Sequence, residues 1–60
     1  MTSKERFLNI YANLPLGLRK EIVVMIDEKP LTWDVAYLEV SNETPLSKQI
    51  LDKLEKHQII

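Results

Sequence analysis

The segment Leu18–Ile26, with the sequence LRKEIVVMI, is the most densely apolar stretch of this chain. Removing apolar surface from water is the dominant favourable term in folding, so the strongest apolar run constrains the fold most. The chain has only 60 residues, which is close to the smallest size at which one hydrophobic core stabilises a domain. We therefore expect the other segments to pack around residues 18–26, in a single domain that spans residues 1–60.

Two conformations fit this central segment. As a helix that begins after Pro15, it carries one apolar stripe formed by Leu18, Ile22, Met25 and Ile26. As a strand, residues 22–26 form a short β-branched run that ends at a charged turn, with residues 31–33 as an antiparallel partner. A helical turn or two over residues 16–21 followed by a hairpin combines the two. Periodicity alone does not resolve apolar runs this short, so the alternatives stay open.

A helix is predicted over the first part of the chain. Thr2 and Glu5 have the spacing of a capping box, in which each side chain bonds to the main-chain amide of the other residue. Apolar residues then recur at helical spacing, at Phe7, Ile10, Tyr11 and Leu14. Pro15 disfavours helical geometry at the residue before it, so the helix ends there.

Two more helices are predicted in the second half of the chain. Thr32 followed by an acidic first turn is a helix start, and the apolar pattern behind it is Trp33, Ala36, Tyr37 and Val40. Thr44 is predicted as the next N-cap, with Pro45 at the first helical position. The apolar stripe of that last helix is Leu46, Ile50, Leu51 and Leu54, continued by His57. The fold class is therefore mainly α, with three to four short amphipathic helices and, as the open alternative, a short β-hairpin around Ile22–Trp33.

The composition limits where this protein works and what it can bind. The chain is 45% hydrophobic and 28% charged, which is typical of a globular protein, and its net charge is −1. It has no cysteine, which excludes disulfides and thiolate metal sites, and its single histidine makes a structural zinc site improbable; no cofactor is expected. Because residues 1–9 are charged and no apolar run approaches the length of a membrane span, we expect a cytoplasmic protein without a membrane segment.

Trp33 and Asp34 are the candidate anchor for a ligand or a partner protein. A large aromatic side chain beside a carboxylate combines apolar contact area with a charged group, as binding hot spots often do. The alternative is structural: Trp33 and Tyr37 have helical spacing in a chain with few aromatic residues, which favours a place in the core.

The remaining titratable groups do not form a catalytic pattern. Asp27, Glu28 and Asp34 lie close together in sequence, but they lack the spacing of a calcium loop, and a solvated turn is the better interpretation. His57 has no nucleophile or orienting carboxylate that the sequence identifies, and a role at the carboxyl end of the last helix is favoured. We therefore expect a protein that is not an enzyme.

One resemblance is carried by the segments Asp27–Trp33 and Val35–Tyr37 and by the closing pattern Ile50-Leu51…Leu54…Ile59-Ile60. The chain resembles small uncharacterised proteins of archaeal genomes that end in a similar helix. The resemblance spans most of the chain, but its motifs are a turn, a helix start and an apolar stripe. It implies no activity, cofactor or site residue.

Association with a second copy of the chain is the predicted function. A 60-residue domain without disulfides or metal often needs oligomerisation to complete its core. The candidate interface consists of apolar residues outside the main stripes: Leu8, Leu38, Ile59 and Ile60, with Val24 added if its segment is helical. The alternative without a functional role is that these are single apolar side chains exposed on the surface, which is common in folded proteins. An unknown protein partner is also compatible with this pattern.

A nucleic-acid-binding helical module, of winged-helix type, is the alternative function. Its candidate contacts are the basic residues Arg19, Lys20, Lys48, Lys53 and Lys56. On the last helix these lysines alternate with Asp52 and Glu55, which weakens the attraction of that surface for phosphate. Nucleic acid is therefore the less favoured partner.

Overall fold

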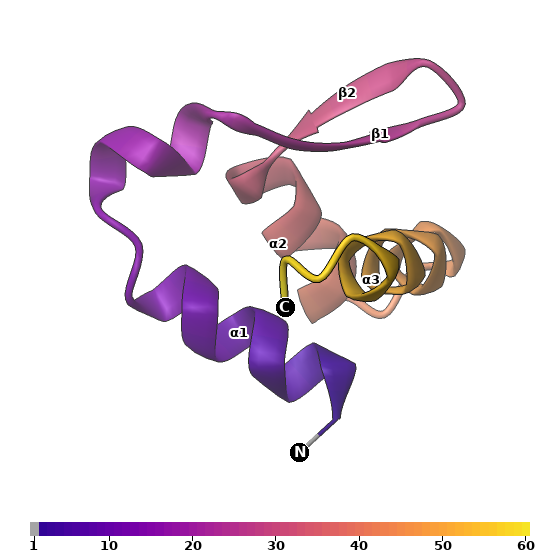
Figure 1. The fold of residues 1–60 in the computed structure, drawn as a ribbon, viewed down its shortest axis with the longest axis horizontal. Coiled ribbons are helices and arrows are strands. Elements are labelled where there is room, and N and C mark those ends of the chain that lie inside the picture. Colours follow the sequence, from indigo (N-terminus) through magenta and orange to yellow (C-terminus); the bar gives the residue numbers. More distant parts are fainter. Residues whose placement is uncertain (1) are drawn as a thin grey trace.

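The computed structural model describes residues 2–60 of the chain. In sequence order its elements are the helix α1 (Ser3–Ala12), the 3₁₀ helix η1 (Leu16–Lys20), the strands β1 (Ile22–Ile26) and β2 (Lys29–Thr32), and the helices α2 (Trp33–Ser41) and α3 (Pro45–Lys56). Figure 1 shows the hairpin on one side of α2 and α1 on the other, with α3 beside them. The predicted fold class, mainly α with a short hairpin, is confirmed.

The predicted start of α1 is confirmed in detail. The Thr2 hydroxyl accepts a hydrogen bond from the amide of Glu5 at 3.1 Å, and the amide of Thr2 donates to the Glu5 carboxylate at 3.1 Å. Two amides that the helix leaves without an internal partner are thereby satisfied. The start of α2 follows the same rule, because the amide of Val35 donates to the Thr32 hydroxyl at 3.2 Å.

The start of α3 lies where it was predicted, but its cap differs. Thr44 precedes Pro45 as expected, yet its side chain accepts no bond from the helix. Its hydroxyl instead donates to the carboxylate of Glu39, at the end of α2. Thr44 is thus the N-cap residue of α3, as predicted, although its hydroxyl makes no hydrogen bond to that helix. The strong acceptor on the preceding helix competes for it, while Pro45 needs no partner because it has no N–H.

The central segment adopts the combined conformation, a short helix followed by a hairpin. Strand β1 pairs antiparallel with β2, and Ile26 faces Lys29 across a turn of two residues, Asp27 and Glu28. Both turn residues have positive φ, 50° and 68°. This left-handed backbone matches the twist of the strands it joins, which is why two-residue hairpins favour it. At the base of the hairpin the amide of Trp33 donates to the carbonyl of Glu21 at 3.2 Å.

A β-bulge at Val23 decides which side chains of β1 are buried. Ile22 pairs with Thr32 and Val24 with Leu31, so Val23 is an extra residue in β1. Strict alternation would turn Ile22 to the same face as Val24. The bulge reverses this, and Ile22 is 59% exposed whereas Val24 is 7% exposed.

The core lies where the three α-helices meet the inner face of the hairpin. The side chains of Phe7, Ala36, Val40, Ile50 and Leu54 are buried almost completely, and Val24, Ile26 and Leu31 close the core from the hairpin. The prediction that the whole of Leu18–Ile26 forms the centre is therefore wrong. A two-stranded hairpin buries one face only, so alternate residues of the segment face away from the core.

Candidate functional site

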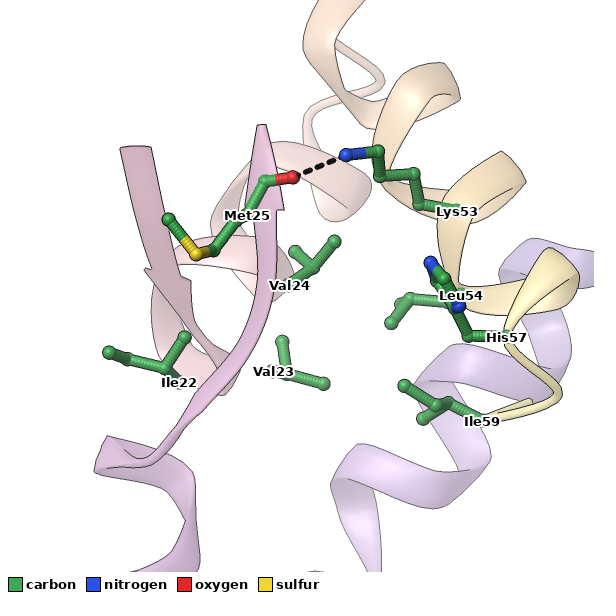
Figure 2. A pocket seen from close by; sticks show the side chains of 8 residues that line it. All are labelled: Ile22, Val23, Val24, Met25, Lys53, Leu54, His57 and Ile59. Carbon is green, nitrogen blue, oxygen red and sulfur yellow. Dashed lines mark hydrogen bonds between the residues drawn. The ribbon is translucent and has the colours of Figure 1, made fainter. Parts of the chain in front are cut away.

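The main candidate site is a groove between β1 and the carboxyl end of α3, which we call the edge groove (Figure 2). Its volume is about 390 Å³. It is lined by Ile22, Val23, Val24, Met25, Lys53, Leu54, His57 and Ile59. The walls are mostly apolar, with the side chains of Lys53, on α3, and of His57, the residue that follows α3. The edge groove therefore suits an apolar or extended occupant better than a small polar substrate.

One wall of the edge groove is a strand edge. Within residues 2–60, β1 pairs with β2 alone. Met25 pairs with Pro30, which has no N–H to donate, and the next pair, Ile26 and Lys29, closes the turn and forms the hydrogen-bonded pair. Because such pairs alternate along an antiparallel ladder, the amide and carbonyl of Met25 point away from β2. They point to the groove side of the strand.

Lys53 covers part of this edge. Its Nζ donates to the Met25 carbonyl at 2.7 Å, as the dashed line in Figure 2 shows. Placing a lysine at a strand edge is a common way to keep that edge from pairing with other chains. The bond also connects the hairpin to α3, whose packing buries Leu54 beneath the groove.

The opposite wall depends on a sharp reversal of the chain after α3. Gln58 has a left-handed backbone, with φ 57°. Its amide donates to Glu55 at 2.9 Å, and the amide of Ile59 donates to Leu54 at 2.9 Å. This is a Schellman motif, in which the residue after the reversal packs back on the helix. It turns Ile59 towards the strand, as Figure 2 shows.

Charge is distributed unevenly along this side of the molecule. A second hollow, of about 250 Å³, lies beside the hairpin turn, and Ile26, Asp27, Gln49, Asp52 and Lys53 line it. The end of the strand nearest the turn is therefore next to two carboxylates. Lys53 lines both hollows, so its ammonium group lies beside these carboxylates as well as in the edge groove, where His57 is the other titratable side chain.

The predicted interface residues are not all in one place. Ile59 lines the edge groove, whereas Leu38, which is 57% exposed, lies on α2. Leu8 and Ile60 are half-buried against the core. Val24 was to be included only if its segment is helical; the segment is a strand, and the side chain of Val24 belongs to the core at the base of the edge groove.

The sequence reasoning missed Ile22, Met25 and Lys53 as residues of one site. The turn at residues 27 and 28 gave the signal for a hairpin, but the bulge that exposes Ile22 has no mark in the sequence. The separation of Met25 and Lys53, 28 positions, also lies outside any local pattern.

The candidate anchor residues Trp33 and Asp34 take part in contacts between α2 and α1. The Tyr11 hydroxyl donates to Asp34 Oδ1 at 2.5 Å, and the ring of Trp33 stacks on Phe7 with the centroids 5.7 Å apart. The hydrogen bond to Asp34 raises the pKa of Tyr11 above its ordinary 10.0, and burial and the negative charge of Asp34 act in the same direction. Both residues thus stabilise the fold, and their role as an anchor stays a prediction.

The other candidate residues are spread over the molecule. Asp34 bonds to Tyr11 and lies apart from the turn residues Asp27 and Glu28, and residues 2–60 contain no group of acidic and histidine side chains that could hold a metal ion. Among the basic candidates, Arg19 lies over the ring of Tyr11, with 4.4 Å between its Cζ and the ring centroid, and Lys53 is bonded to Met25. Nucleic-acid binding stays an untested alternative.

Comparison of the chain with models of protein families, with curated proteins and with solved structures finds no match. The resemblance to small archaeal proteins stays an expectation. A search of the helices within residues 2–60 finds none with the length and apolar character needed to cross a membrane. The functional proposal below therefore depends on the surface of this chain itself.

Proposed function

We propose that this protein is a binding module that works by associating with protein, in the first place with a second copy of itself. The observation that supports the proposal is the amount of large apolar surface that the fold leaves outside its core. The side chains concerned are Leu16, Leu18, Ile22, Met25, Val35, Leu38 and Ile59. Single exposed apolar residues such as Leu16 are ordinary, but Ile22, Met25 and Ile59 lie together at the edge groove, and an apolar patch is typical of a surface that is covered by association.

The small hairpin gives the proposal a second support. An isolated two-stranded hairpin is marginally stable in water, and this one is held by packing on α2 and α3. Its outer face exposes Ile22 and Met25, the latter 51% exposed, and β1 has the edge described above. Association that covers this face would stabilise the least supported element of the fold.

Sedimentation equilibrium tests the proposal. The chain has a mass of 7.0 kDa, and we expect the weight-average mass to rise towards twice this value as the concentration increases through the micromolar range. A mass that stays at one chain up to about 1 mM, where a dimer would gain only about 4 kcal/mol, contradicts the proposal.

A pair of variants locates the association surface. Met25→Gln adds a polar group to the hairpin face, and Leu16→Gln does the same on η1 at a side chain that is 74% exposed. We expect Met25→Gln to weaken association about tenfold and Leu16→Gln to leave it nearly unchanged. Circular dichroism confirms that both variants keep the fold.

A further inference from the structure

We infer that the edge groove binds a short aliphatic monocarboxylate, with the carboxylate between Lys53 and His57 and the alkyl chain between Val23 and Ile59. The inference goes beyond the proposed function and does not depend on it, because the ligand occupies the groove of a single chain.

The apolar part of the site is closed at its base by the core. Val24 and Leu54 form this base and are 7% and 0% exposed. Val23, the extra residue of the bulge, and Ile59, which follows the chain reversal, point towards each other from the two sides of the edge groove (Figure 2). The volume of about 390 Å³ is at the lower end of the range for small-molecule sites, so a short alkyl chain suits the groove in size.

The two polar side chains of the edge groove both donate hydrogen bonds. Lys53 uses one N–H of its ammonium group on the Met25 carbonyl, and it makes no ion pair within residues 2–60, so two N–H groups are left for a ligand. The His57 ring has an N–H in either tautomer and no bonded partner in the same part of the chain. Figure 2 shows both side chains on the α3 side of the groove. A carboxylate, which only accepts hydrogen bonds, is the group that matches these donors.

The neighbouring acidic side chains determine where the carboxylate lies. None of those within residues 2–60 lines the edge groove. Glu55 accepts a hydrogen bond from α1 at 2.6 Å, and Asp52 lines the hollow beside the hairpin turn together with Asp27. Lys53 borders that hollow too, so the two aspartates repel an anion from the turn end of the strand. The carboxylate therefore belongs on the His57 side of Lys53, with its chain running away from the turn.

The same repulsion limits the ligand to one negative charge. A dicarboxylate of equal length places its second charge either near the aspartates or against the apolar side chains of Val23 and Ile59, and both positions are unfavourable. An alkylammonium ion places a positive charge beside Lys53, where it also lacks an acceptor.

A series of ligands tests the chemical class. Octanoate is titrated into isotope-labelled protein at constant protein concentration, and the amide resonances of Val23, Leu54 and Ile59 are followed by NMR. We expect saturable shifts of these resonances, with octanoate binding at least about tenfold more tightly than butyrate, because the longer chain buries more methylene groups. Octylamine and suberate, the dicarboxylate of the same length, should bind at least about fivefold more weakly than octanoate. Equal affinities for octanoate and octylamine, or no groove shifts up to about 10 mM octanoate, overturn the inference.

Variants of Lys53 test the position of the carboxylate. Lys53→Met keeps an apolar side chain and removes the charge, and we expect it to bind octanoate about threefold to fivefold more weakly. Lys53→Arg keeps the charge and should bind within about twofold of the natural chain. Lys48→Met is the matched control, because Lys48 is on the same helix but outside the groove. Circular dichroism checks that each variant is folded. If Lys53→Met and Lys48→Met bind octanoate equally well, the carboxylate is not held as inferred.

A variant of Ile59 tests the position of the chain. Ile59→Ala removes part of one apolar wall and should weaken octanoate about fivefold while leaving butyrate nearly unchanged. Leu38→Ala, at an exposed apolar position on α2, is the control and should change neither affinity. Equal effects of the two substitutions contradict the inferred path of the chain.

The failure of this inference and that of the proposed function are distinguishable. Groove resonances that shift with protein concentration and not with octanoate overturn the ligand site and leave self-association intact. Octanoate that binds in the groove of a chain that sedimentation shows to be monomeric overturns self-association and supports the ligand site.

Discussion

The Met25 carbonyl accepts a hydrogen bond from Lys53 Nζ at 2.7 Å, across 28 positions of the chain. This contact is the polar link between the hairpin and the last helix. It occupies the strand edge with a charged side chain, and it does so from the helix that carries Ile50 and Leu54, two residues of the core. The edge of β1 is therefore positioned by the same helix that stabilises the fold.

Removing this lysine should expose the edge with little loss of stability. We expect Lys53→Met to lower the free energy of unfolding by less than about 1 kcal/mol, because a solvent-exposed hydrogen bond contributes little net energy. The variant should aggregate faster on warming, because the edge loses the charge that covers it. Lys48→Met, on an exposed part of the same helix, is the control. Light scattering during a thermal ramp compares them, and equal aggregation rates would contradict the role of Lys53.

The hairpin turn should be more stable with glycine at its second position. Glu28 has φ 68°, a left-handed conformation that costs a residue with a Cβ atom but not glycine. We expect Glu28→Gly to raise the free energy of unfolding by about 0.5–1 kcal/mol, and Tm by about 3–6 °C. Lys29→Gly, one residue later in β2, should instead lower stability, since glycine weakens a strand. Urea denaturation of the two variants checks both signs.

Glycine should also stabilise the chain reversal after α3. Gln58 occupies the left-handed position of a Schellman motif, where glycine is usual. Gln58→Gly should raise the free energy of unfolding by about 0.5–1 kcal/mol. Lys56→Gly, two positions earlier and inside the helix, should lower it by a similar amount. If both substitutions destabilise the protein, the reversal is not held as described.

The largest predicted change in the free energy of unfolding is for a substitution in the core. Leu54 is completely buried where α3 meets β1 and α1, and we expect Leu54→Ala to cost about 2–5 kcal/mol. For so small a domain this is much of the total stability. Leu16→Ala, at an exposed position of η1, should change stability by less than about 0.5 kcal/mol. Chemical denaturation that gives similar losses for the two would contradict the described core.

The hydrogen bond between Tyr11 and Asp34 predicts a dependence on alkaline pH. Because the pKa of Tyr11 is raised in the folded protein, its contribution to stability is complete below pH 10.0, the ordinary value, and is lost as the pH rises through the folded value. The difference in unfolding free energy between the natural chain and Tyr11→Phe should therefore shrink above pH 10.0. Tyr37→Phe is the control, and urea denaturation at pH 8 and pH 11 measures both.

Local signals in the sequence predicted most element boundaries. Thr2 with Glu5, Thr32 with Asp34 and Pro45 each act on neighbouring residues, and the three α-helices begin where these residues place them. The sequence did not decide between a hairpin and a helix for residues 22–32, because the turn lacks glycine and the apolar run fits a helix as well. The turn formed despite the cost of a left-handed Glu28 because the inner faces of both strands are buried.

The candidate site was much less predictable than the helices. It depends on the bulge at Val23, which changes the face of Ile22, and on a bond between Met25 and Lys53 from distant segments. Neither follows from spacing along the chain, because each results from how the hairpin packs on α3. Ile59 was predicted for the interface and lies in the edge groove, because its apolar position after the last helix was visible in the sequence.

The bond from the Trp33 amide to the Glu21 carbonyl, at 3.2 Å, has a practical consequence for engineering. It fixes the entry and exit of residues 22–32 beside each other, so the two ends of the hairpin keep their positions whatever the length of its turn. Because Val24, Ile26 and Leu31 of this segment complete the core, the place for inserted recognition loops is the exposed turn at Asp27 and Glu28, beyond these residues.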